Sequence, residues 1–254
     1  MNAIEIRNLT KNFGEKQALT GLNMTVPMGS IYGFIGENGS GKSTTEKLIC
    51  GHLVKDSGSI KLFGKDYTDA GVRVKVGALI ENAGCFPGAS IYTNLKMQAL
   101  NLGIENPDEE IDRVLKIVRM QENKQLKFKK CSLGMKQRIG IAMALLGSPA
   151  LLILDEPING LDANSVMIFK EILSQLAAQG KTIFYSSHLM DVVEKISSRI
   201  ILLYDGKIAA DGTFAELQAD NAAGTLEGIF NELTGFDNYK EIGEQFVSVV
   251  QEVL

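Results

Sequence analysis

The sequence predicts an α/β fold with a mixed, mainly parallel central sheet, an N-terminal antiparallel β subdomain and a helical subdomain. Alternating apolar and polar residues at 3–9 and 22–26 are typical of half-buried strands that face one core. Two continuous apolar runs, at 151–154 and 182–185, are separated by a helical pattern and are typical of strands buried on both faces of a parallel sheet. A chain of 254 residues is long enough for one large domain with a small appendage.

The overall composition excludes several classes of protein. Apolar residues make up 45% of the chain and charged residues 22%, which is typical of a globular domain and not of a disordered or collagen-like chain. The net charge of −4 gives no long-range attraction to a phosphate polymer, so we expect no nucleic-acid partner. The three cysteines follow no zinc-binding or disulfide pattern. Because the longest uncharged run, 139–154, is too short for a bilayer and Glu5 and Arg7 argue against a signal peptide, we expect a cytoplasmic protein.

The first half of the chain is expected to contain short strands around one helix. The apolar run 31–35 predicts a third strand, and this run ends directly in a cluster of glycines. A short helix is expected at 44–50, followed by strands near 59–63 and 74–80. The pattern therefore changes from mainly β to alternating β and α.

A helical subdomain is predicted for about residues 85–147. Ser90 is suited to cap a helix, and Asn106 followed by a proline and three acids is a strong helix start, because acids are favourable at the positive end of the helix dipole. A later helix ends before Gly147 and Pro149. Its apolar residues recur at Met135, Ile139, Met143 and Leu146.

The next part of the chain completes the predicted sheet. Asp162 is suited to cap a helix that ends at Gly180, and the sequence Asp-Gly at 205–206 predicts a hairpin with a two-residue turn. Thr213 and Glu216 have the spacing of a capping box. The inward face of the helix after Asp162 is expected to consist of Val166, Phe169, Leu173 and Leu176.

Two amphipathic helices are predicted at the C-terminal end, at 226–233 and 239–253. The apolar stripe of the second helix favours a core or subunit contact over a membrane anchor, because no basic face accompanies it. We therefore expect a main domain at 1–235 and a separate C-terminal helix at 236–254.

A glycine-rich motif lies between the predicted strand 31–35 and the helix that follows it. Residues 36–43 read Gly-Glu-Asn-Gly-Ser-Gly-Lys-Ser, which matches the phosphate-binding pattern Gly-x-x-x-x-Gly-Lys-Ser. Glycines let backbone N–H groups converge on phosphate oxygens, Lys42 can reach the β- and γ-phosphates, and the Ser43 hydroxyl can bind Mg²⁺. The predicted phosphate-binding residues are Gly36, Glu37, Asn38, Gly39, Ser40, Gly41, Lys42, Ser43 and Thr44.

Two acids follow the buried strand 151–154. Asp155 is suited to bind Mg²⁺, and Glu156 can polarise a water for attack on the γ-phosphorus. His188 follows the strand 182–185, so it should emerge at the same edge of the sheet as Asp155. A lone histidine is more often structural, so on spacing alone a structural role for His188 is favoured over a catalytic one.

The order of the motifs resembles that of one large family. Residues 131–138, Cys-Ser-Leu-Gly-Met-Lys-Gln-Arg, are similar to the signature motif of ATP-binding cassette (ABC) ATPases, and residues 159–162 resemble the loop that follows the acid pair in that family. The resemblance to an ABC transporter subunit covers residues 1 to about 235. It implies that Lys42, Glu156 and His188 are catalytic, with His188 as the switch histidine that contacts the γ-phosphate.

The resemblance also implies the cofactors and partners. ATP and Mg²⁺ would bind between two cassettes, identical or different, that pair head to tail, and hydrolysis would drive a separate membrane permease from the inner face of the cell membrane. Phe13 would stack on the adenine. Ser132 and Gly134 would bind the nucleotide held by the other cassette, and Asp162 is the aspartate that the family usually has in the neighbouring loop.

The chain departs from the family pattern at three positions. Leu133 replaces a signature glycine, Met135 replaces the signature glutamine, and Glu81 stands where most relatives have glutamine. We expect Glu81 among the nucleotide contacts and the metal ligands. With an acid at this position the chain resembles the branch of the family that exports lantibiotics and bacitracin-like peptides. The segment 226–235 resembles the tail of drug-exporter subunits, with a generic packing helix as the alternative.

Two other functions stay open at this point. The altered signature would also suit a regulatory nucleotide-binding module without useful hydrolysis, although Glu156 and His188 argue against it. A soluble ABC-type ATPase of DNA repair or translation is disfavoured by the lack of a coiled-coil insertion, a second cassette or an excess of basic residues. The basic stretch 124–130 is interpreted as a solvated face and not as a phosphate or permease contact.

Overall fold

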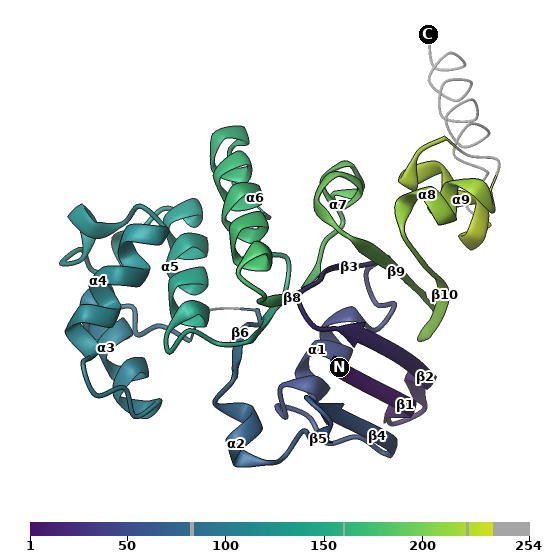
Figure 1. Ribbon diagram of the computed structural model, residues 1–254, viewed down its shortest axis with the longest axis horizontal. Coiled ribbons are helices and arrows are strands. Elements are labelled where there is room, and N and C mark those ends of the chain that lie inside the picture. The colour runs from purple at the N-terminus through teal and green to yellow at the C-terminus, as the bar shows by residue number, and fades with distance from the viewer. Residues whose placement is uncertain (82–83, 160, 222–223, 236–254) are drawn as a thin grey trace, which may run out of the picture.

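The computed structural model describes residues 1–81, 84–159, 161–221 and 224–235. Within these ranges the strands form an antiparallel sheet and a mixed sheet, as Figure 1 shows. The antiparallel sheet has the order β2 (Lys16–Pro27), β1 (Asn2–Phe13), β4 (Ser57–Leu62) and β5 (Lys65–Asp66). The mixed sheet has the order β10 (Lys207–Gly212), β9 (Arg199–Tyr204), β3 (Ile31–Gly36), β8 (Thr182–Ser186), β7 (Leu151–Leu154) and β6 (Val76–Leu79).

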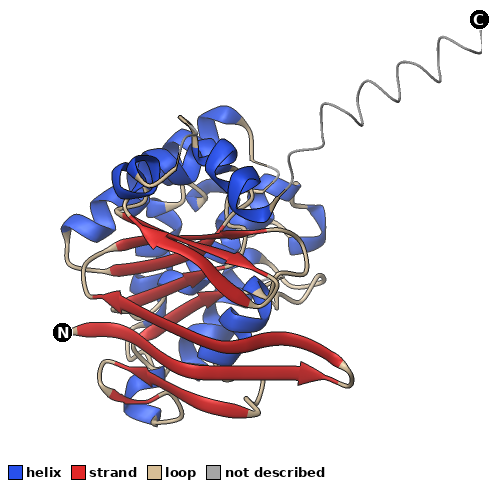
Figure 2. Cartoon of the chain, turned by 90° about the vertical axis from the view of Figure 1, so that its right-hand side faces the viewer, coloured by secondary structure: helices blue, strands red, loops and turns tan. Residues whose placement is uncertain are grey.

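The mixed sheet is parallel from β9 to β6, and β10 pairs with β9 antiparallel at one edge. Figure 2 shows the strands of both sheets in the body of the molecule, with most of the helices above them in that view. This architecture confirms the predicted fold of a mixed, mainly parallel sheet with an N-terminal antiparallel part.

The helices of the described residues fall into an N-terminal, a central and a C-terminal group. The first two are α1 (Lys42–Ile49) and α2 (Ala70–Arg73). The central group is α3 (Ile91–Asn101), α4 (Pro107–Ile117) and α5 (Leu133–Leu145), which contact one another within the range predicted for a helical subdomain and lie at the left of Figure 1. The C-terminal group is α6 (Ala163–Ala178), α7 (Met190–Ile196), α8 (Phe214–Ala219) and α9 (Leu226–Thr234).

The central strands β3, β8 and β7 of the mixed sheet are buried on both faces, as their apolar residues predicted. In β7, Leu151 and Ile153 join an apolar cluster with the antiparallel sheet and α1, while Leu152 and Leu154 join a second cluster with the helices on the opposite face. All four side chains are buried. A continuous apolar strand is stable here because both of its faces are covered.

Several local signals act as the sequence predicted. Ser90 caps α3, Asp162 caps α6, and Thr213 with Glu216 forms a complete capping box at the start of α8. Each cap satisfies a backbone N–H that the first helical turn leaves without a partner. The turn at 205–206 connects β9 and β10, and both of its residues have positive φ, as a two-residue hairpin turn requires.

The structure also differs from the prediction in a few places. The strands β1 and β2 are longer than the alternating segments that predicted them, and α2, α7 and β5 were not predicted. Asn106 precedes α4, but its side chain forms no cap hydrogen bond. Leu233 is exposed and does not join the apolar face of α9. The predicted helix at 236–254 lies outside the described residues, and no described helix is long and apolar enough to cross a bilayer.

Candidate active site

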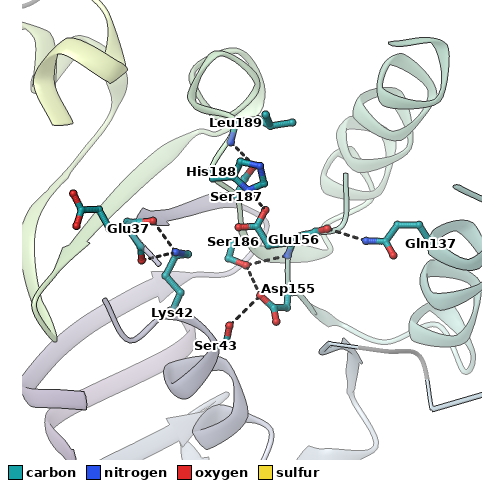
Figure 3. A network of polar contacts seen from close by, with 11 residues as sticks. Glu37, Lys42, Ser43, Gln137, Asp155, Glu156, Ser186, Ser187, His188 and Leu189 are labelled. Carbon is teal, nitrogen blue, oxygen red and sulfur yellow. Dashed lines mark hydrogen bonds and ion pairs between the residues drawn. The ribbon is translucent and has the colours of Figure 1, made fainter. Parts of the chain in front are cut away.

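The predicted site residues meet at one edge of the mixed sheet. Strands β3, β8 and β7 are adjacent and parallel, so the segments that follow them emerge side by side. The glycine loop follows β3, Asp155 and Glu156 follow β7, and His188 lies just beyond β8. Figure 3 shows these side chains converging from three separate parts of the chain. The expectation that His188 shares an edge with Asp155 is confirmed.

The glycine loop has a backbone shape that excludes side chains at two positions. Gly41 has a φ of 111°, in the region that favours glycine, and a Cβ there would lie 2.7 Å from the Ala18 carbonyl oxygen. A Cβ at Gly36 would lie 2.3 Å from the Leu203 carbonyl oxygen. Gly41 directly precedes α1, whose N-terminus is favourable for a bound anion. The glycine loop therefore forms a cradle at the N-terminal end of α1, which is the positive end of the helix dipole.

Lys42 supplies a cationic group for a phosphate in this cradle. The Lys42 ammonium donates to the Gly36 carbonyl at 2.7 Å and to the Glu37 carbonyl at 3.0 Å. Burial lowers the pKa of Lys42, and the neighbouring acids, Glu156 foremost, act in the opposite direction. The Ser40 hydroxyl is buried and has no hydrogen-bond partner among the described residues. Ser40 is not among the residues that line the cradle pocket, whereas Lys42 is, so Lys42 is the side chain of this pair that fits a phosphate ligand.

Ser43 and Asp155 lie together below the cradle. The Ser43 hydroxyl is 3.4 Å from Asp155 Oδ1, and the same oxygen accepts a hydrogen bond from the buried Ser186 hydroxyl at 2.9 Å. These contacts hold the Asp155 carboxylate toward the first turn of α1. The arrangement fits the predicted Mg²⁺ ligands, because Mg²⁺ is bound by oxygens and commonly by few protein groups together with phosphates and waters.

The described residues contain no group of three or more His, Cys, Asp or Glu side chains arranged to bind an ion. Glu81 lies at a positive φ of 56°, and its carboxylate forms an ion pair with Lys47 of α1. The structure thus places Glu81 against α1, and its proposed contact with metal and nucleotide stays a prediction.

The side chains of three other residues form hydrogen bonds with Glu156. Its N–H donates to the Ser186 hydroxyl at 3.0 Å, and its carbonyl accepts from the Gln137 side chain at 2.8 Å. Its carboxylate Oε2 is 2.8 Å from Nδ1 of His188. The two residues predicted to act on the γ-phosphate are therefore in direct contact, and both line a hollow beside the cradle together with Glu37 and Asn38.

Phe13 lines the cradle pocket, and His188 lines the hollow beside it. The cradle pocket has a volume of about 380 Å³ and also includes Lys42, Ser43 and Thr44. Phe13 is 49% exposed, and the Lys11 ammonium lies 5.4 Å from the centroid of its ring. An exposed aromatic ring at the mouth of a phosphate cradle is suited to stack on a nucleotide base.

The signature residues lie elsewhere on the chain. Ser132 is exposed and caps α5 by accepting a hydrogen bond from the Met135 N–H at 3.2 Å, and Gly134 lies in the first turn of that helix. Neither residue lines the cradle pocket. Asp162 accepts hydrogen bonds from the Ser165 N–H and hydroxyl, and these bonds lower the pKa of Asp162. Gly160 of the same loop lies outside the described residues.

Three residues of the site were not predicted. Ser186 joins Asp155 to the Glu156 backbone, Gln137 reaches Glu156 from α5, and Glu46 is fully buried in α1 behind the cradle. The only sequence signal for Ser186 was its place at the end of an apolar strand. Gln137 stood inside the signature-like segment, with no spacing that pointed to Glu156.

Comparison with known proteins decides the family. A family model described as "ABC transporter" matches residues 19–159, more than half of the chain. The chain belongs to the ABC transporter family. It is 37% identical over 234 residues to the lantibiotic transport ATP-binding protein SrtF of Streptococcus pyogenes, covering 92% of this chain and 98% of that protein. It is 38% identical over 222 residues to the bacitracin transport ATP-binding protein BcrA of Enterococcus faecalis, covering 86% and 71%.

A solved structure agrees with this assignment. The chain superposes on an ATP-binding subunit of an ABC transporter with a TM-score of 0.83 and 26% identity, covering 91% of this chain and 99% of the other. The resemblance seen in the sequence, including that to lantibiotic and bacitracin transport subunits, is confirmed. The protein is an ATP-hydrolysing ABC transporter subunit.

Proposed function

We propose that this ABC ATPase is Mg²⁺-dependent and powers the export of a peptide antibiotic through a separate membrane permease. The names of its lantibiotic and bacitracin transport relatives support the substrate class. We place the subunit on the cytoplasmic side of the membrane, bound to that permease. In this proposal the cargo binds to the permease, and ATP hydrolysis by this chain supplies the mechanical work.

The convergence of the cradle with two acids and a histidine carries the proposal. In this proposal Lys42 binds phosphate oxygens, and Ser43 and Asp155 would hold Mg²⁺, which would neutralise phosphate charge. Glu156 orients a water and takes up its proton. His188, in contact with Glu156 at 2.8 Å, adds a hydrogen-bonding group at the γ-phosphate end.

A second cassette completes each site in this proposal. Ser132, Gly134 and Asp162 are accessible ends of helices α5 and α6, and Ser132 and Gly134 do not line the cradle of their own chain. They would bind the nucleotide held by a partner in a head-to-tail dimer, of two copies or of two different cassettes. Leu133, 63% exposed beside Ser132, would face the same interface. ATP then joins the two cassettes, and hydrolysis separates them.

The decisive experiment replaces Glu156 with glutamine and measures Mg²⁺-dependent phosphate release. Glu156→Gln keeps the shape and removes the base, so turnover should fall by about 10²-fold or more while ATP still binds. Glu171→Gln is the matched control, because Glu171 is exposed on α6 and bonded only to Gln175 among the polar contacts described.

The outcomes separate the alternatives. Wild-type turnover in Glu156→Gln would contradict the assigned base. Absence of phosphate release from the wild-type protein, with ATP binding intact, would favour the regulatory module. The substrate class is tested separately: cells that lose this chain should become more sensitive to peptide antibiotics, and the permease should co-purify with the wild-type subunit.

A further inference from the structure

The backbone of Glu156 is anchored from two sides. On one side the Glu156 N–H donates to the buried Ser186 hydroxyl at 3.0 Å. On the other side the Glu156 carbonyl accepts from Gln137 Nε2 at 2.8 Å and from the Asn159 N–H at 3.1 Å. Figure 3 shows Gln137 reaching across from α5 to this carbonyl. Of the two donors to this carbonyl, Gln137 is the one that comes from helix α5.

The conformation of Glu156 needs such anchoring. Its φ is 46°, in the left-handed region that residues other than glycine rarely adopt. A residue with a side chain stays there only when its surroundings hold it, and such residues gather at functional sites. Glu156, like Asn38, also lines both the cradle pocket and the hollow that contains His188. The direction of its carboxylate therefore depends on the groups that fix its backbone.

Gln137 connects this backbone to the signature. It lies in α5, five positions after Ser132, the residue that caps the helix. An α-helix transmits a displacement of its N-terminus along its length, because consecutive turns are hydrogen-bonded to one another. A shift of Ser132 or Gly134 on contact with a partner's nucleotide would reach the Glu156 carbonyl through the Gln137 amide.

We propose that Gln137 is a positioning residue that holds Glu156 in its left-handed conformation and links it to the signature of the same chain. The inference rests on the proposed function and deepens it. Each cassette would thereby adjust its own base when its signature engages the nucleotide of the other cassette. Without the Gln137 donor, the Glu156 carbonyl keeps only the Asn159 N–H, and the backbone can relax toward an ordinary φ.

Gln137→Met tests this role, because methionine has nearly the same length and no N–H donor. We expect kcat to fall by at least about tenfold, since small misplacements of a catalytic group are costly. Affinity for ATP should stay within about twofold, because Gln137 does not line the cradle pocket. Gln175→Met is the matched control: Gln175 is exposed on α6 and bonded to Glu171.

A second measurement does not depend on turnover. In the segment 156–159 the amides of Glu156, Ile158 and Asn159 can be followed, because residue 157 is proline. Without nucleotide, their hydrogen exchange should become about tenfold faster in Gln137→Met, while β7 and α5 stay as protected as in the wild type. Gln175→Met should leave both kcat and exchange unchanged. Urea unfolding of each variant establishes that the fold is intact.

The proposal requires both changes. Wild-type exchange at 156–159 in Gln137→Met would overturn it, whatever happens to turnover, and so would faster exchange with unchanged kcat. These results are distinct from a failure of the proposed function, which would show as absent phosphate release in the wild-type protein itself.

Discussion

Replacing the buried Glu46 with glutamine is expected to make the protein progressively more stable than the wild type as the pH rises. Glu46 lies in α1 and its side chain is 0% exposed. Its carboxyl is close enough to Asp155 and Ser186 to hydrogen-bond with them. Burial, and then the charge of Asp155, raise the pKa of Glu46 well above its ordinary value of 4.5. The folded protein therefore keeps a proton on this carboxyl at pH values at which the unfolded chain has already released it.

The size of the effect follows from the proton balance. Above pH 4.5 the unfolded chain releases the Glu46 proton, whereas the folded chain retains it up to its raised pKa. The folded state then binds one more proton than the unfolded state, so the free energy of unfolding falls by about 1.4 kcal/mol per pH unit from this group alone. The stabilising contribution is complete below the ordinary pKa and is lost as the pH rises toward the folded pKa.

Glu46→Gln removes the titration and keeps the shape of the side chain. The difference in unfolding free energy, variant minus wild type, should rise with pH by up to about 1.4 kcal/mol per unit. Urea unfolding at pH 5.5, 6.5 and 7.5, analysed by linear extrapolation, measures this difference and cancels the groups that both proteins share. The chain has no tryptophan, so circular dichroism is the suitable signal.

Glu109→Gln provides the control, because Glu109 is exposed on α4. Its difference from the wild type should be nearly independent of pH. A flat difference for Glu46→Gln as well would refute the reasoning, since it would mean that the buried carboxyl titrates alike in the folded and unfolded chain.

Two further substitutions test other parts of the structure. Phe13→Ala should weaken ATP binding by about 1–3 kcal/mol, because the stacking of Phe13 on the adenine is lost. Nucleotide titration measures the affinity, and Phe86→Ala is the control because Phe86 is also exposed. Equal affinity of the two variants for ATP would count against the adenine contact. Gly77→Ala should destabilise the protein by about 3 kcal/mol in urea unfolding, because the new Cβ would lie 1.9 Å from the Ala144 carbonyl oxygen. Gly88→Ala is the control and should be neutral, because a Cβ at Gly88 would lie in open space. Wild-type stability of Gly77→Ala would contradict the packing of β6 on α5.

The parts of the site that follow strand ends could be predicted from the sequence. Asp155 and His188 each come directly after an apolar strand, and parallel strands place such residues at one edge. The cradle was predicted for the same reason, since its glycines lie between a strand and a helix. These features depend on local order along the chain, which the sequence contains.

The parts that depend on packing could not be predicted. Gln137 meets Glu156 through the approach of α5 to the end of β7, and no spacing encodes that approach. Glu46 is a charged residue in a short helix, where periodicity favours a solvent-facing position, and only the sheet packed over α1 buries it. The helix α7 is too short for its apolar period to be distinguished from a loop.

A structure of Glu156→Gln with bound ATP and Mg²⁺ tests the central claim most directly. The β- and γ-phosphates should lie within hydrogen-bond distance of the Lys42 ammonium, with Ser43 and Asp155 among the metal's ligands. A nucleotide bound elsewhere on the chain, or an empty cradle at saturating ATP, would contradict it.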